Sequence, residues 1–290
     1  MTALLLAVLI QEGALDVLDG ETLYEDGWLF TMGYERVEKR TLREGTRRRS
    51  DPLDRRQVDQ AVVASAHYGL RHDLQLSLIV PWVRRELSLD GDDAAADGPG
   101  DVTAAAKYRY LRLDGPGWAT NFAVLGGLEL PTGSDDERDG GARLPADLQP
   151  GSGSWDPFLG TGLTHEPGRW RFNAFAFYRL NGQGGHDYAR GDELFFELAA
   201  GNRFWLEPYP GPFMRADVML RYRKEFRDRE GGGIVHDTGG EQLTAGLNYA
   251  FRPRPTLDFQ ISVEVPLWES VKGVQLAETF AAFFAIGVRI

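Results

Sequence analysis

The stretch Phe213–Glu225, which reads FMRADVMLRYRKE, alternates apolar and polar residues along most of its length. One set of alternate positions is apolar: Met214, Ala216, Val218, Leu220 and Tyr222. The other set is largely charged: Arg215, Asp217, Arg221, Arg223 and Glu225. Because successive side chains of a strand point to opposite faces, the stretch predicts a strand with one apolar and one charged face. A membrane barrel turns such an apolar face toward lipid and keeps the charges in its lumen.

Similar stretches recur between Trp28 and Ile290. Twelve strands are predicted, at about 28–38, 57–68, 73–85, 101–113, 118–131, 155–164, 169–181, 192–206, 213–226, 241–252, 256–268 and 275–290. Tight turns rich in Gly and Pro alternate with longer polar connections, at 39–56, 86–100, 132–154, 182–191 and 227–240; the connection 269–274 is short. Outer-membrane barrels show this asymmetry. The sequence therefore predicts an all-β fold, a twelve-stranded antiparallel up-and-down transmembrane barrel with short periplasmic turns and longer outer loops.

Composition restricts the chemistry of the chain. The net charge of −11 argues against nucleic acid as a partner, because phosphate binding requires a basic surface. The chain has no cysteine, which excludes disulfides and thiolate metal sites. It also has no apolar run of about 18 residues, the length that a transmembrane helix needs. A soluble lipocalin-like barrel that binds a ligand remains the alternative fold.

The N-terminus precedes the first predicted strand. Residues 3–10 form an apolar run as long as the core of a signal peptide, but no basic residue precedes it. We expect residues 1–10 to be a truncated signal peptide, residues 11–27 an N-terminal periplasmic segment, and residues 28–290 the barrel. The alternative is that the apolar run is an ordinary first strand or helix packed on a core.

Four short motifs follow one another along the chain. They are Gly100-Asp101-Val102, Leu130-Pro131-Thr132-Gly133-Ser134, Gly151-Ser152-Gly153-Ser154-Trp155-Asp156-Pro157 and Val265-Pro266-Leu267. Their order and spacing resemble the outer-membrane "transporter" barrels of the putative MetA-pathway of phenol degradation family. The resemblance implies an outer-membrane location in a Gram-negative-type bacterium and a link to phenol degradation. It also implies the barrel-assembly machinery as a partner during biogenesis, although the chain ends on Ile290 where many such barrels end on an aromatic residue.

Pro131 and Pro266 of these motifs, together with Pro81, are interpreted as residues at the loop ends of strands, since proline cannot donate to a sheet ladder. Two acidic clusters, around 90–101 and 135–139, are interpreted as solvated outer loops. Calcium binding there is the alternative, but the EF-hand spacing is absent. We therefore predict no metal site and no cofactor.

Catalysis has little support in the sequence. Ser65 and His67 share the polar face of one predicted strand, and their positions are separated by about 7 Å along it, which argues against a hydrogen-bonded nucleophile and base. No Gly-x-Ser-x-Gly elbow occurs. We expect that the protein is not an enzyme and has no catalytic residue.

The inward faces of the strands carry the candidate functional residues. The predicted pore-lining set is Lys107, Arg109, Glu129, Arg171, Phe175, Phe177, Arg179, Glu193, Glu197, Arg203, Arg215, Asp217, Arg221 and Arg223. These charges either pair and close the interior or form a basic wall that orients solutes, with a modest preference for anions.

The predicted function is passive passage of small aromatic or amphipathic solutes, with membrane lipid and the solute as partners. A non-conducting barrel that binds or anchors is the alternative.

Overall fold

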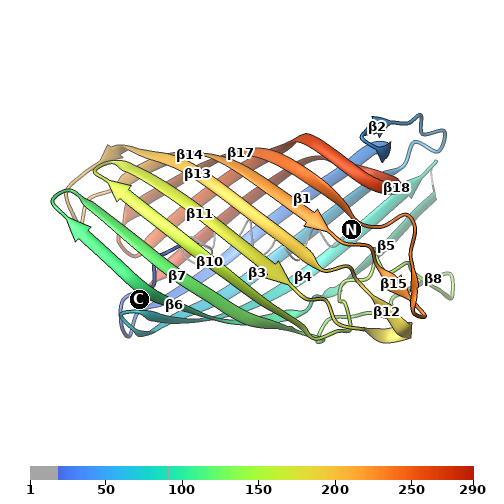
Figure 1. The fold of residues 1–290 in the computed structure, drawn as a ribbon, viewed down its shortest axis with the longest axis horizontal. Helices are drawn as coiled ribbons and strands as arrows, with labels where there is room; N and C mark the ends of the chain where they lie inside the picture. The colour runs from blue at the N-terminus through green and yellow to red at the C-terminus, as the bar shows by residue number, and fades with distance from the viewer. Residues whose placement is uncertain (1–18, 91) are drawn as a thin grey trace.

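The computed structural model describes residues 19–90 and 92–290, so the expected signal peptide at 1–10 lies outside the described residues. An antiparallel sheet curls into a closed barrel (Figure 1). Its wall consists of β1 (Trp28–Gly45), β3 (Arg56–Arg71), β4 (Leu74–Leu89), β6 (Val102–Gly115), β7 (Trp118–Leu130), β10 (Asp156–Pro167), β11 (Trp170–Arg179), β13 (Glu193–Leu206), β14 (Phe213–Glu225), β17 (Gly240–Arg254) and β18 (Leu257–Arg289). Pairing of β18 with β1 closes the barrel.

Short elements lie at one end of the barrel. Two extend the wall: β2 (Arg47–Arg48), paired with β1, and β5 (Asp92–Pro99), paired with β4. The others lie in loops: β8 (Arg138–Asp139), β9 (Ala142–Arg143), the 3-10 turn η1 (Gly185–Asp187), β12 (Tyr188–Ala189), β15 (Arg229–Glu230) and β16 (Gly233–Ile234). Within residues 19–90 and 92–290, no helix is long and apolar enough to cross a membrane.

The two ends of the barrel differ. At the turn end, on the left of Figure 1, short connections join β3 to β4, β6 to β7, β10 to β11, β13 to β14 and β17 to β18. The chain terminus also lies there, because Ile290 and Trp28 exchange backbone hydrogen bonds of 2.9 Å. The longer connections, with the short elements described above, gather at the opposite loop end. This asymmetry agrees with the prediction from connector length.

The wall is apolar on the outside. On β4 the outward side chains of Leu76, Leu78, Val80 and Trp82 are 41–54% exposed, whereas Gln75, Ser77, Ile79 and Val83 face inward and are 0–7% exposed. The same alternation runs along the other wall strands. A soluble barrel would bury its apolar face, so the lipocalin-like alternative is wrong. The outer wall is suited to contact lipid, as predicted.

The number of strands differs from the prediction. The wall contains eleven strand elements rather than twelve, since the two last predicted strands form the single element β18. Residues 257–271 of β18 pair with β17 and residues 271–289 pair with β1, both antiparallel. Gly273, with φ of +75°, lies where the partner changes, so the chain reverses there without leaving strand structure. The expected connection at 269–274 is too short to interrupt the pairing.

Several wall strands are longer than predicted. β1 continues to Gly45 and β4 to Leu89, into stretches that were expected to be loops. Polar side chains interrupt the apolar alternation there, but they do not prevent backbone pairing beyond the lipid.

Two of the prolines expected to end strands, Pro81 and Pro266, lie inside β4 and β18. Near Pro81 the partner of β4 changes from β6 to β5, and near Pro266 the pairing with β17 shifts register, so a missing N–H is tolerated at both places.

Candidate functional site: the barrel interior

Packed apolar side chains line the middle of the barrel interior. The rings of Phe158, Phe175, Phe177 and Phe195 have centroids 5.2–6.5 Å apart. A Cβ on Gly160 would lie 2.8 Å from the Phe175 ring, so a wall glycine makes room for it. The rings belong to a buried cluster with Val37, Ala61, Val63, Ile79, Val83, Ala105, Leu125 and Ala281. We call this cluster the apolar belt.

Buried ion pairs accompany the apolar belt. The guanidinium of Arg179 on β11 contacts Glu129 Oε2 at 2.7 Å through Nη1 and Glu193 Oε1 at 2.8 Å through Nη2, and the three side chains are at most 1% exposed. The contacts join β7, β11 and β13. A buried guanidinium that holds two carboxylates fixes all three side chains, because separating them would leave uncompensated charge.

A second buried cluster surrounds Arg221 on β14. Arg221 Nε donates to Glu197 Oε2 at 2.5 Å, and Nη1 contacts Glu264. Glu35 on β1 is fully buried, and neither of its carboxylate oxygens has a hydrogen-bond partner among the described residues. This cluster therefore holds one carboxylate without a bonded counter-charge.

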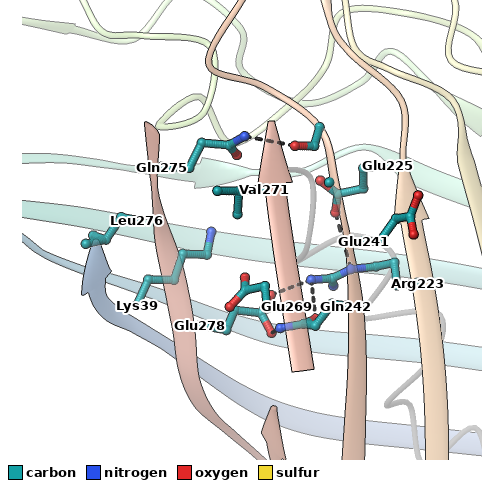
Figure 2. Close-up of a pocket in the computed structure, with 12 residues that line it drawn as sticks. Lys39, Arg223, Glu225, Glu241, Gln242, Glu269, Val271, Gln275, Leu276 and Glu278 are labelled. Carbon is teal, nitrogen blue, oxygen red and sulfur yellow. Dashed lines mark hydrogen bonds and ion pairs between the residues drawn. The ribbon is translucent and has the colours of Figure 1, made fainter. Parts of the chain in front are cut away.

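Ion pairs also close the loop end of the interior. Figure 2 shows Arg223 beside Glu278 and Glu225; the guanidinium lies 2.6 Å from Glu278 Oε1 and 3.3 Å from Glu225 Oε1. On the neighbouring β1, Lys39 Nζ contacts Asp59 Oδ2 at 2.9 Å. The cavity left among these side chains is about 40 Å³, enough for little more than a water molecule.

The N-terminal segment occupies the interior at the turn end. Asp19 accepts from Lys107 Nζ at 2.8 Å and from Arg171 Nη2 at 2.5 Å. The backbone N–H of Leu23 donates to Gln75 Oε1 at 3.0 Å, and the Leu23 side chain is 3% exposed. Residues 19–23, which we call the plug segment, are thus held by wall side chains rather than by strand pairing.

A glycine lets the plug segment approach the wall. Gly20 N donates to Thr164 Oγ1 at 2.9 Å. A Cβ at this position would collide with the carbonyl oxygen of Asn121 and would lie 2.7 Å from the Thr164 nitrogen. Only glycine therefore fits this position with the segment in place.

The plug segment and the wall meet mainly at Arg171. Besides Asp19, this guanidinium contacts Glu21 and Glu166, both at 2.7 Å, and its side chain is 5% exposed. Arg203 shares Glu166. One buried cation thus holds two carboxylates of the plug segment and one of the wall.

The structure places the predicted pore-lining residues on the inward face, with Arg109 at the turn-end rim, where it donates to the His72 carbonyl at 2.5 Å. The six arginines of β11, β13 and β14 each contact a carboxylate: Arg171, Arg179, Arg203, Arg215, Arg221 and Arg223. This geometry favours paired charges over an open basic wall. Their influence on ion preference stays a prediction.

Several interior residues were absent from the predicted set: Asp19, Glu21, Lys39, Arg85, Glu166, Arg252, Glu278 and Arg289. Alternation within the last predicted strand assigns Arg289 to the interior, and alternation continued one residue past the end of the first predicted strand assigns Lys39. It does not assign Glu278, which a register shift between β1 and β18 brings to the interior. Nothing in the sequence indicates that Asp19 and Glu21 turn back into the barrel.

The expectation that Ser65 and His67 are too far apart to bond is wrong. Ser65 Oγ lies 2.7 Å from His67 Nε2, and His67 Nδ1 lies 2.8 Å from Ser77 Oγ. The side chains lean toward each other across the distance between their backbones. His67 Nδ1 thus contacts a hydroxyl, whereas the histidine of a catalytic triad contacts a carboxylate. The imidazole is also fully buried. Ser77 in turn accepts a hydrogen bond from Gln75, and Gln75 accepts one from Leu23 of the plug segment. The hydrogen-bonded row from Ser65 to Gln75 therefore supports the plug segment.

The solvated-loop interpretation is wrong for Asp101. Its side chain is fully buried, and its carboxylate accepts from Gly133 N at 2.8 Å and Ser152 N at 2.5 Å. These three residues come from three of the four sequence motifs, which therefore meet at one junction. Gly151 N also donates to the Ser134 carbonyl at 2.8 Å. The motif junction ties the loop-end connections of β6, β7 and β10 together.

Comparisons with known proteins complete the description. The family model described as "Putative MetA-pathway of phenol degradation" matches residues 61–270. The crystal structure of the COG4313 outer membrane channel from Pseudomonas putida F1 superposes with a TM-score of 0.74 at 16% identity, over 95% of this chain and 99% of that chain. The β domain of the Bordetella autotransporter Brka gives a TM-score of 0.49 at 11% identity, over 90% and 99% of the two chains. No curated protein sequence matches.

Proposed function

Because this chain belongs to the family described as Putative MetA-pathway of phenol degradation, we propose that it is a channel for passive passage of small aromatic or amphipathic solutes. The chain is a closed barrel with an apolar outer wall and the fold of an outer membrane channel, and it resides in the outer membrane of Gram-negative-type bacteria. We propose no catalytic role, since the comparisons are with channels and autotransporter barrels.

The apolar belt is the observation that carries the proposal. Four phenylalanine rings line an interior that a water-filled pore for hydrophilic solutes would make polar. Aromatic solutes can stack on such rings and leave water at little cost. The phenol connection comes from the description of the family.

The plug segment determines whether the turn end of this channel is open or closed. Its removal would break side-chain contacts at the turn end but no strand pairing, so the turn end can open without unfolding of the barrel. We therefore expect low conductance in the plugged state and higher conductance when the segment leaves.

Planar-bilayer recordings test the proposal with Gly20→Leu as the unplugged variant. Its side chain collides with Asn121, so we expect a larger conductance than that of the wild type. The matched control is Gly126→Leu on β7, where a Cβ would meet nothing closer than 3.8 Å. Phenol should block the current of the open variant more strongly than glycerol does, because only phenol stacks on the belt.

A non-conducting barrel that binds or anchors is the second candidate, and the dense ion pairing of the interior favours it. If wild type and Gly20→Leu are both silent in bilayers and in liposome swelling, this second function replaces the first.

A further inference from the structure

The outward side chains of β1, β3 and β4 change from apolar to polar near the loop end. Strand register places three apolar side chains side by side, each 41–54% exposed: Tyr34, Val62 and Trp82. The next outward row toward the loops is polar: Arg36, Gln60 and Arg84. Because outward aromatic side chains mark the membrane interface of a barrel, the polar row lies at the level of the lipid headgroups.

Three arginines of β1 and β3 surround a single carboxylate at this level. The Glu38 carboxylate is 3.0 Å from a guanidinium nitrogen of Arg56 and 3.5 Å from one of Arg36. A guanidinium nitrogen of Arg40 lies 3.6 Å from it. The side chain of Glu38 is 8% exposed and those of the arginines are 32–55% exposed, so the guanidiniums cover the carboxylate. We call these four residues the arginine patch.

The arginine patch carries two positive charges that no ion pair offsets. Among the described residues, Glu38 is the one carboxylate that its three arginines contact. Glu86 on β4 lies near Arg56 but contacts Arg84 at 3.2 Å, and Asp97 on β5 is paired in register with Arg84. Residues 44–55, which follow toward the loops, contain four arginines and three carboxylates, so they do not neutralise the patch.

A phosphate group attached to a lipid matches this surface. Guanidiniums bind phosphate oxygens through paired N–H donors, and a phosphate monoester carries a charge of about −1.5 to −2 at neutral pH. Arginine clusters beside a membrane attract anionic lipid headgroups. The apolar row of Tyr34, Val62 and Trp82 lies directly below the patch, where the acyl chains of the same lipid would be.

We propose that the arginine patch binds a membrane lipid whose headgroup is a phosphate monoester, with its acyl chains against Tyr34, Val62 and Trp82. The patch lies on the outer wall and not in the lumen, so this site goes beyond the proposed channel and does not depend on conductance. Such a lipid would stabilise β1, the strand whose pairing with β18 closes the barrel.

Quenching of Trp82 fluorescence tests the site with the barrel inserted into dioleoyl phosphatidylcholine vesicles. A minor fraction of the lipid is either phosphatidic acid or phosphatidylcholine with brominated chains, which quench a tryptophan that they contact. The difference between wild type and Trp82→Phe isolates the signal of Trp82. We expect the association constant to be at least about fivefold higher for brominated phosphatidic acid, because one arginine at an anionic lipid surface contributes about that factor. Equal quenching by the two lipids would overturn the proposal.

The variant that removes the site is Arg36→Gln combined with Arg56→Gln. It leaves Glu38 with Arg40 alone and therefore without excess charge, so the preference for phosphatidic acid at Trp82 should disappear. A preference that persists in this variant would place the lipid elsewhere and refute the assignment.

The matched control is Arg71→Gln combined with Arg112→Gln. These exposed arginines lie at the turn end, and each contacts a carboxylate of its own, Asp73 or Asp114. The preference for phosphatidic acid at Trp82 should remain in this control. Heat-modifiable gel mobility checks that each variant is folded.

Inorganic phosphate distinguishes a lipid site from a site for the free ion. At matched ionic strength, inorganic phosphate and chloride should reduce the preference for phosphatidic acid equally, because neither ion brings acyl chains to the apolar row. A loss of the preference with inorganic phosphate but not with chloride would show that the patch binds the free ion and would overturn the lipid assignment.

Discussion

The two ends of the barrel interior are closed in different ways. At the loop end, side chains of the wall pair with one another, as Arg223 does with Glu278 and Lys39 with Asp59. At the turn end, a separate stretch of chain fills the lumen and is held by wall residues such as Arg171. A closure built from the wall cannot open without rearranging it. A closure built from a segment outside the sheet can leave while every strand pair remains.

Arg171→Gln should break the turn-end closure and have the largest effect. Removal of a buried cation that faces three carboxylates costs about 3–5 kcal/mol. We expect most of this loss to weaken binding of the plug segment to the wall rather than stability of the wall itself. We expect higher bilayer conductance and faster proteolysis near residues 19–23, while the barrel keeps its heat-modifiable mobility. The exposed Arg112→Gln should change stability by less than about 1 kcal/mol. A variant with unchanged conductance and proteolysis would show that the segment does not depend on Arg171.

Asp101→Ala tests whether the loop end depends on the motif junction. The substitution leaves the buried N–H groups of Gly133 and Ser152 without their acceptor, which should lower the free energy of unfolding by about 2–3 kcal/mol. Urea unfolding of the barrel in detergent or lipid measures it. Asp101→Asn keeps an acceptor oxygen and should lose less. Equal losses in both variants would mean that the negative charge, rather than the hydrogen bonds, matters there.

Glu35→Gln should stabilise the barrel. The Glu35 carboxylate is fully buried and accepts no hydrogen bond from the described residues, so removal of its charge should raise the free energy of unfolding by about 1–2 kcal/mol. The urea midpoint measures the change, and Glu129→Gln is the control of opposite sign because Glu129 is paired with Arg179. A destabilised Glu35→Gln barrel would mean that this carboxylate has a favourable interaction.

The smallest effect concerns ion preference at the loop end. Arg221→Glu combined with Arg223→Glu reverses two charges of the interior, and the reversal potential in a salt gradient should shift toward cation preference. Because these arginines are already paired, we expect a shift on the order of 10 mV, which corresponds to about 0.2 kcal/mol per unit charge. No shift would show that the two arginines are paired wall structure rather than a selectivity element.

The sequence predicts the wall better than the contents of the lumen. The outward row of Leu76, Leu78 and Val80 follows from two-residue alternation alone, because a strand has no other way to place those side chains. Alternation also assigns Arg179 to the inside. It does not say which carboxylate Arg179 contacts, since that depends on the register between strands.

The sequence does not predict contacts between distant segments. In the sequence, Asp101 is one of several aspartates in a predicted loop. It is buried because three motifs meet around its carboxylate. The prediction that Ser65 and His67 do not bond rests on the spacing of their backbones, whereas the distance between their side chains depends on the rotamers. The plug segment carries no periodic pattern, because its conformation is set by the lumen that surrounds it.

The plug segment has a consequence for the order of assembly. Gly20 and its partner Thr164 are 144 residues apart in the chain, and Asp19 is 152 residues from Arg171. The plug segment is synthesised before the wall, yet its binding surface exists only once β6, β7, β10 and β11 are paired in the sheet. Contacts of such long range form late. Each barrel is therefore expected to pass through an unplugged stage during biogenesis, with its turn end open until the wall that holds residues 19–23 is complete.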